Sequence, residues 1–335
     1  MRPRVSSSAF EGALERGRAG DVDLESALTL FRGADTVGRA RELFRAATEL
    51  RDRHLGRTVT LTAHLHMVTR CEVSPPCHYC SLSSSRAAVS EEREKLGTSE
   101  LLRHVREATD RGVDAIVLVG GTVFDGSDDP VRELLPRVLD ATDADLALDI
   151  GPSLSEETLR WLARLGVRTV YCSVETVNPR AFAAAKPGDR LATRLQFMDM
   201  VDRVGLSLGN VVMNGLGRPR DLIASILHSK RFRHLSHLHI STFQPVPGTP
   251  WAGRRPGSVA TSLKALAIAR LVFPGVQLGL AEVGVEDPKG LRRGPNQLEV
   301  GGGNTLAALL IYKHLKIDRL DWVRRRVQEL GFTAS

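Results

Sequence analysis

Three of the four cysteines in this 335-residue chain fall within ten residues, as Cys71, Cys77 and Cys80 in the run CEVSPPCHYC. Thiols clustered in a chain otherwise poor in cysteine are typical of a metal site rather than a disulfide framework. Three thiolates can hold a four-iron cluster and leave one iron with an open coordination position, whereas a structural zinc ion prefers four protein ligands. The spacing therefore predicts a metal centre, with an iron–sulfur cluster and zinc as the two alternatives.

The fourth cysteine, Cys172, could in principle complete a zinc site. It lies in a strand-like run in which Thr169, Tyr171, Ser173 and Glu175 alternate with Val170, Cys172 and Val174. Alternate residues of a strand face opposite sides, so Cys172 shares its side with two valines. We expect it to be buried against helices as an apolar filler, which favours the three-thiolate cluster over zinc.

The elements that must position these residues alternate along the chain from Thr58 onward. Eight strand-like runs are expected at 58–67, 113–119, 146–150, 168–174, 206–213, 237–243, 276–281 and 297–300, with helical stretches such as 99–111, 130–141, 155–165 and 192–204 between them. Such alternation predicts an α/β protein with parallel strands joined by right-handed crossovers. Eight units over about 250 residues favour a closed (β/α)8 barrel of the TIM type, and a doubly wound open sheet is the alternative.

Apolar residues at helical intervals, among them Leu24, Leu28 and Phe31, predict a helical N-terminal extension over residues 1–57. The barrel is expected to occupy residues 58–315. Basic and apolar residues alternate from Lys313 to Arg326, which predicts an amphipathic C-terminal helix within 316–335 that packs on the barrel.

The charge balance invites a nucleic-acid interpretation, because 46 Lys and Arg against 39 Asp and Glu give a net charge of +7. The basic residues are scattered, however, and only 3 Trp and 3 Tyr are present as stacking platforms. No apolar run approaches the roughly 18 residues that span a bilayer, and no signal-peptide core precedes residue 57. We expect a cytoplasmic protein with no nucleic-acid or membrane partner.

In a barrel of this type, chemistry belongs at the carboxyl ends of the strands. The cysteine run follows the first expected strand, Gly120 and Gly121 follow the second, Glu175 follows the fourth, and Asn214 ends the fifth. The agreement between motif positions and strand ends supports the barrel.

A barrel whose first loop carries three cysteines ending in Cys-x-aromatic-Cys resembles the radical S-adenosylmethionine (SAM) superfamily, most closely its biotin-synthase-like branch. The usual spacing there is three and then two residues, and here Pro75 and Pro76 lie in a five-residue gap. That longer spacing is similar to the HmdB-type maturase, which helps to build the guanylylpyridinol cofactor of iron-only hydrogenase.

The resemblance implies cofactors and ligands. Cys71, Cys77 and Cys80 match the ligands of a [4Fe-4S] cluster, and Tyr79 matches the aromatic residue beside the SAM adenine. Other positions match SAM-binding segments, namely Gly120, Gly121 and Thr122 for the methionyl amine, Ser173 and Glu175 for the ribose, Arg194 for the carboxylate, and Met213 and Asn214 for the adenine. Two positions depart from the pattern, since Thr122 and Arg218 stand where many members have glutamate.

The activity implied is reductive cleavage of SAM to a 5′-deoxyadenosyl radical, which abstracts hydrogen from a small polar substrate and needs an electron donor such as flavodoxin or ferredoxin. Strand alternation directs His66, His239 and Ser241 into the lumen, and Glu282 and Glu299 lie near the last two expected strand ends, so these five are candidates for the substrate pocket.

Biotin synthase itself inserts sulfur from a second cluster. The matching positions here are Leu118, Ala147, Gly209 and Gln277, and none is Cys or Arg. Carbon–carbon cleavage, rearrangement or transfer in cofactor or natural-product biosynthesis is therefore expected rather than sulfur insertion. Two alternatives stay open: a degenerate, non-catalytic iron–sulfur or zinc protein, and an RNA-modifying radical SAM enzyme.

Overall fold

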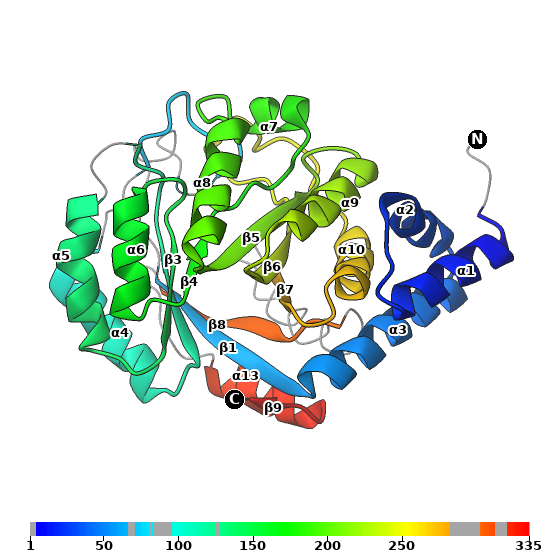
Figure 1. The fold of residues 1–335 in the computed structure, drawn as a ribbon, viewed down its shortest axis with the longest axis horizontal. Coiled ribbons are helices and arrows are strands. Elements are labelled where there is room, and N and C mark those ends of the chain that lie inside the picture. Colours follow the sequence, from blue (N-terminus) through cyan, green and yellow to red (C-terminus); the bar gives the residue numbers. More distant parts are fainter. Residues whose placement is uncertain are drawn as a thin grey trace.

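The computed structural model describes residues 5–65, 71–80, 82, 96–124, 128–281, 302–311 and 320–334. Eight parallel strands form one curled sheet in the order β7-β6-β5-β4-β3-β2-β1-β8, with helices around its outside (Figure 1). The strands are β1 Thr58–Leu65, β2 Ala115–Val119, β3 Asp145–Asp149, β4 Thr169–Tyr171, β5 Ser207–Asn214, β6 Leu235–Thr242, β7 Gln277–Ala281 and β8 Thr305–Ile311. Because β1 pairs with both β2 and β8, the first and last strands meet as in a barrel, and the expected fold class is confirmed.

Helices follow most of the strands and cover the outer face of the sheet. They are α4 Thr98–Asp110, α5 Asp128–Leu139, α6 Glu156–Leu165, α7 Pro179–Ala185, α8 Leu191–Val204, α9 Pro219–His228 and α10 Val259–Val272, with a short 3-10 turn at Ser229–Arg231. Asn178 caps α7 by accepting from two backbone N–H groups, and Pro179 takes the first helical position, which is the arrangement its sequence predicts.

Three helices precede the barrel: α1 Ser7–Arg18, α2 Leu24–Gly33 and α3 Val37–Leu55. They lie on the β5–β7 side, against α9 and α10 (Figure 1). Their buried side chains, such as Phe10, Leu30 and Leu43, join a core with Leu266 and Leu271 of α10. The expected helical extension is therefore part of the same packed body as the barrel.

Strand alternation sorts side chains between the helix layer and the lumen. Leu61, Ala63 and Leu65 of β1 are fully buried in the core under α4–α6, while Thr62 and His64 take the other face. On β6, Leu238 and Ile240 pack under α9 and α10, and His239 and Ser241 face inward. The inward orientation of His239 and Ser241 that the sequence predicts is consistent with this packing.

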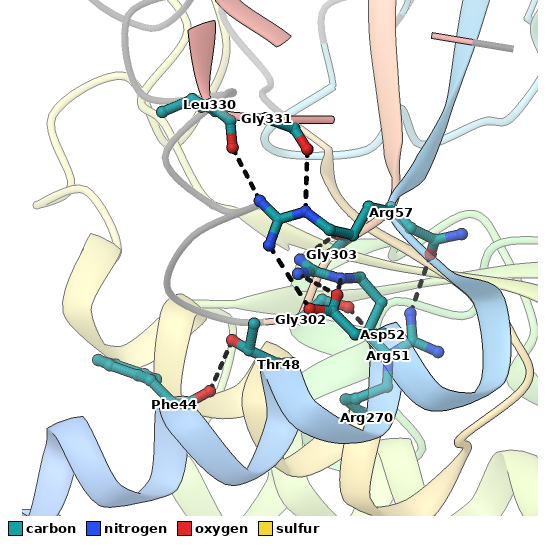
Figure 2. Close-up of polar contacts among 11 residues, drawn as sticks. Phe44, Thr48, Arg51, Asp52, Arg57, Arg270, Gly302, Gly303, Leu330 and Gly331 are labelled. Carbon is teal, nitrogen blue, oxygen red and sulfur yellow. Dashed lines mark hydrogen bonds and ion pairs between the residues drawn. The ribbon is translucent and has the colours of Figure 1, made fainter. Parts of the chain in front are cut away.

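The amino-terminal ends of the strands are held together by arginines (Figure 2). Arg270 of α10 donates to the carbonyls of Gly302 and Val276 at 2.9 and 2.7 Å and to Asn304 Oδ1 at 2.9 Å. Asn304 also exchanges hydrogen bonds with the backbone of Leu278, at 2.9 and 3.0 Å, and so joins β7 to the start of β8. These contacts close the gap between the two outermost strands.

The C-terminal segment seals the same end. Helix α13 Leu320–Glu329 leads to β9 Thr333–Ala334, which pairs in parallel with the start of β1. Arg57 donates to the carbonyls of Leu330 and Gly331 at 2.8 and 2.9 Å and covers the Phe332 ring at 4.3 Å. Of the helix expected over 316–335, the structure describes α13, which ends at Glu329, and Thr333–Ala334 form a strand instead.

The eighth strand was expected at 297–300, which lies outside the described residues; the strand that pairs with β1 is Thr305–Ile311. The continuous apolar run of six residues at 306–311, without alternation, does not distinguish a strand from a buried helix, and for this reason the sequence misplaces it. The three glycines at 301–303 consequently precede the strand instead of following it. No helix in the described part of the chain is long and apolar enough to cross a membrane.

Candidate active site

The cysteine loop lies across the carboxyl ends of the strands and is fixed by backbone contacts. His78 N donates to Ala185 O at 2.9 Å, and Trp251 N donates to His78 O at 2.9 Å. At the start of the loop, Glu72 N donates to Thr122 O at 2.9 Å. Three separate βα loops therefore hold the residues that carry the thiols.

Two glycines allow this close packing. A Cβ on Gly121 would collide with the backbone of Cys71, and a Cβ on Gly188 would collide with the backbone of Ser74 and Pro75. Neither φ is unusual, so the requirement is for space and not for backbone freedom. Gly121 thus has a physical role beside the first cysteine whatever it does toward a ligand.

The three thiols are withdrawn from water to different degrees, since Cys77 is buried and Cys71 and Cys80 are half-buried. Burial raises the pKa of the Cys77 thiol to about 12, and Lys186 partly opposes that shift. Burial also raises the pKa of Cys80, against the N–H of Leu82, which donates to its sulfur at 3.3 Å. Such thiols keep their protons until a metal centre displaces them.

The donor set fits a four-iron cluster. Cys71, Cys77 and Cys80 are all free and are soft ligands in one loop, and the charges of Cys71 and Cys77 each interact with that of Cys80. Within the described residues, no three Cys, His, Asp or Glu side chains converge on one metal position. The loop therefore supplies the right donors without presenting them already gathered around one point.

Cys172 lies away from these donors. It is fully buried in the core between the sheet and the helices, and its thiol donates to Arg194 O at 3.7 Å. The expectation that it is a packed apolar residue is confirmed, which removes the fourth ligand that a zinc site would need.

Arg194 of α8 is buried beside the second loop. Its Nε donates to Asp189 Oδ2 at 2.6 Å, Nη1 donates to Ser173 O at 2.9 Å, and Nη2 donates to Thr122 Oγ1 at 3.1 Å. The guanidinium thus joins three elements that resemble SAM-binding segments, and it has its own carboxylate partner.

Glu175 stands in the left-handed region at φ 54°, the one residue other than glycine with positive φ among those described. Its N–H donates to Val211 O at 2.9 Å and its carbonyl accepts from Met213 N at 2.8 Å, so β5 fixes it from both sides. Its carboxylate pairs with Lys186 Nζ at 2.6 Å, and both side chains are buried. A strained backbone held this firmly is typical of functional sites.

An apolar cluster lies beside this pair. Tyr79, Met213, Leu216 and Phe243 pack together, with Trp251 against them at ring distances of 6.2 Å to Tyr79 and 5.9 Å to Phe243. Burial and the charge of Glu175 raise the pKa of Tyr79 well above its usual value. The flat apolar walls suit an aromatic base.

Two positions of the resemblance have clear structural roles. Asn214 Nδ2 donates to Ser258 O at 2.8 Å and Ser262 Oγ at 3.1 Å, which ties the end of β5 to the start of α10. Gly120 N donates to Asp149 O at 2.9 Å and continues the pairing of β2 with β3. Arg218, where a glutamate is common, precedes α9, and its N–H donates to Asp221 at 2.8 Å.

Below the loops, polar groups line the lumen. The Tyr171 ring lies over Gly209, where any Cβ would collide with it, and contacts the rings of His237 and His239 at 5.7 and 5.9 Å. His239 Nε2 and Ser241 Oγ are buried and have no hydrogen-bond partner in the part of the chain that the structure describes. Burial lowers the pKa of His237 to about 4 and that of His239 to about 3, so both rings are neutral at neutral pH.

Of the expected pocket residues, the structure brings His239 and Ser241 together in the lumen, whereas His66, Glu282 and Glu299 lie outside the described residues. The sequence interpretation missed Lys186, Asp189, Asp149 and Trp251. The segment Lys186-Pro187-Gly188-Asp189 offers a signal for the first two, because charged residues flank a turn directly after a helix. One assumed lumen position is wrong, because Leu118 packs with the helices and Val117 faces inward.

Comparisons with known proteins agree with this geometry. Residues 65–229 match the family model described as Radical SAM superfamily. A biotin synthase of Corynebacterium jeikeium is 23% identical, covering 99% of this chain and 92% of that protein. A protein of Methanocaldococcus jannaschii described as uncharacterized is 25% identical, covering 77% and 68%. The crystal structure of methylornithine synthase (PylB) superposes with a TM-score of 0.81 at 19% identity, covering 96% and 97%, and shows the same fold.

Proposed function

The chain is an enzyme of the radical SAM superfamily, and on this basis we propose that it cleaves SAM reductively at a [4Fe-4S] cluster and abstracts hydrogen from a small polar substrate in the lumen. The observation that carries the proposal is that three free cysteines share one loop at the carboxyl ends of the strands, and the inward face of the same sheet carries the buried polar groups of His239 and Ser241. The cofactors, when bound, supply the 5′-deoxyadenosyl radical; a closed barrel keeps that radical from water.

The residues of the chain would divide the work by position. Cys71, Cys77 and Cys80 would hold the cluster. The methionyl end of SAM would be bound by Arg194 and by the backbone at Gly120, Gly121 and Thr122. That backbone would offer N–H and carbonyl groups. Ser173 and Glu175 would receive the ribose hydroxyls, because a carboxylate accepts two hydrogen bonds from a diol. The apolar wall of Tyr79 and Met213 would hold the adenine, with Asn214 ordering the adjacent loop.

Two features support a substrate with hydrogen-bonding groups. His239 Nε2 and Ser241 Oγ are two residues apart on β6, face the lumen and have no hydrogen-bond partner within the described ranges. Leaving such groups unpaired inside a protein costs free energy, which a polar ligand would recover. His66, Glu282 and Glu299 remain candidates for the same pocket.

Sulfur insertion of the biotin-synthase kind is not part of the proposal. The lumen positions Val117, Ala147, Gly209 and Gln277 include no cysteine or arginine to hold a second cluster. The proposed reactions are carbon–carbon cleavage, rearrangement or transfer in the biosynthesis of a cofactor or natural product. The two extra residues in the cysteine spacing support a maturase of the HmdB type as one such case, and neighbouring hydrogenase genes would strengthen it.

The test is anaerobic reconstitution followed by incubation with SAM and a reductant. The wild-type chain should bind about four irons and release 5′-deoxyadenosine. Cys77→Ala should lose both properties, and Cys172→Ala, the matched control, should keep both. A chain that binds iron but leaves SAM intact under these conditions would instead support the degenerate alternative. Flavodoxin or ferredoxin should replace the chemical reductant, in keeping with a reducing, cytoplasmic setting for the free thiols.

A further inference from the structure

Among the described residues, five charged side chains at the mouth of the barrel interact with one another, and acids outnumber bases in this group. Three carboxylates (Asp149, Glu175 and Asp189) interact there with two cations, Lys186 and Arg194. Each cation already has a carboxylate at 2.6 Å: Glu175 for Lys186 and Asp189 for Arg194. Within the described residues, the carboxylate of Asp149 has neither an ion pair nor a hydrogen bond.

Asp149 is the last residue of β3, at the end of the sheet where the cysteine loop lies. It ends β3 opposite Val119 of β2, with Leu146 and Leu148 directed to the helix layer and Ala147 to the lumen. Alternation therefore directs Asp149 to the lumen. Burial and the charge of Asp149 raise the pKa of Tyr171, and the Tyr171 ring contacts the ring of His239.

The opposite wall supplies a second observation. His239 Nε2 and Ser241 Oγ are at least nine-tenths buried, face the same lumen and have no hydrogen-bond partner among the described residues. The inward face of the barrel thus carries neutral hydrogen-bonding groups on β6 and, on β3, the half-buried acid Asp149, which has no partner in the described part of the chain. A carboxylate partly withdrawn from water is less favourable unless a cation joins it. The cost is visible in the pKa of Asp149, which burial and the charge of Glu175 raise to about 6.

We propose that Asp149 binds a positively charged group of the ligand in this chamber, so that the substrate class is an amine-bearing small molecule. The identity of the chamber as a substrate site rests on the proposed function. SAM itself brings a sulfonium and is the second source of a positive charge.

The test compares Asp149→Asn and Asp149→Glu with Asp145→Asn, a control at the exposed end of the same strand, where Asp145 pairs with Arg168 on the surface. Butylammonium and the neutral butanol serve as fragments, observed by saturation-transfer NMR on the reconstituted protein. We expect Asp149→Asn to weaken butylammonium at least about tenfold and to leave butanol unchanged, with Asp149→Glu retaining cation binding.

The two sources are separated by calorimetry with SAM and S-adenosylhomocysteine, which lacks the sulfonium charge. If Asp149→Asn weakens the binding of SAM but not that of S-adenosylhomocysteine, the cation at Asp149 is the sulfonium. If it weakens only the binding of butylammonium, the cation belongs to the substrate. Unchanged binding of both cations, or equal behaviour of the Asn and Glu variants, overturns the inference. The fragment measurement needs no SAM cleavage, so its outcome is distinct from failure of the proposed function.

Discussion

Replacing Lys186 by methionine should expose how much the site depends on one buried ion pair. Lys186 Nζ and Glu175 Oε2 are 2.6 Å apart, and their side chains are 5% and 11% exposed. Methionine keeps most of the volume but leaves the Glu175 carboxylate buried without its cation. Removing one partner of a buried pair costs about 3–5 kcal/mol. With an entropy of unfolding of about 2.1 cal/mol/K per residue, that corresponds to a fall of roughly 4–7 °C in Tm for a chain of this length.

The assay is thermal unfolding of four proteins: the wild type, Lys186→Met, Glu175→Gln and the double variant. Because the two changes remove a single interaction, the double variant should lose less stability than the sum of the single losses, by about 2 kcal/mol or more. Arg160→Met is the control, since Arg160 pairs with Glu156 at 2.7 Å on the surface and should cost no more than about 0.5 kcal/mol. Additive losses, or a Lys186→Met protein as stable as the control, would refute the reasoning.

Three other outcomes follow from the structure. Gly209→Ala should lower stability by about 1–3 kcal/mol in a denaturant titration, because the added methyl meets the Tyr171 ring. Arg194→Ala should weaken SAM in a binding titration while cluster assembly is kept, and undiminished affinity would leave Arg194 a purely structural partner of Asp189. The free energy of unfolding should fall as pH drops from about 6.5 towards 4, because the unfolded chain protonates His237 and His239 in this range while their folded pKa values are about 4 and 3. Each histidine lowers the stability by up to about 1.4 kcal/mol per pH unit. His239→Gln should therefore flatten the curve of Tm against pH.

Much of the barrel is readable from alternation alone. On β1 and β6, leucine and isoleucine alternate with threonine, histidine and serine, which predicts both the strand and its inward face. Seven strands were expected within a few residues of their bounds. The eighth was not, because Thr305–Ile311 is apolar after its first residue and shows no alternation.

The site could be predicted where chemistry is local and not where it depends on partners. The three thiols are evident from spacing, and the burial of Cys172 follows from its neighbours on the strand. The pairing of Lys186 with Glu175 and of Asp189 with Arg194 could not be read in the same way. It depends on how the segment after α7 folds back over the strand ends. That is a tertiary arrangement, which a local periodicity does not predict.

The contacts that arginines make at the amino-terminal end of the barrel affect the order in which the chain folds. Arg57 reaches the carbonyls of Leu330 and Gly331 across 273 and 274 residues of sequence, and β1 finds one of its strand partners in Thr333–Ala334. Contacts so distant in sequence form late, because closing the intervening loop must precede them. A growing chain on the ribosome therefore exposes this edge of its first strand until Thr333 and Ala334 emerge. Chaperones that shield unpaired strand edges have their longest opportunity there.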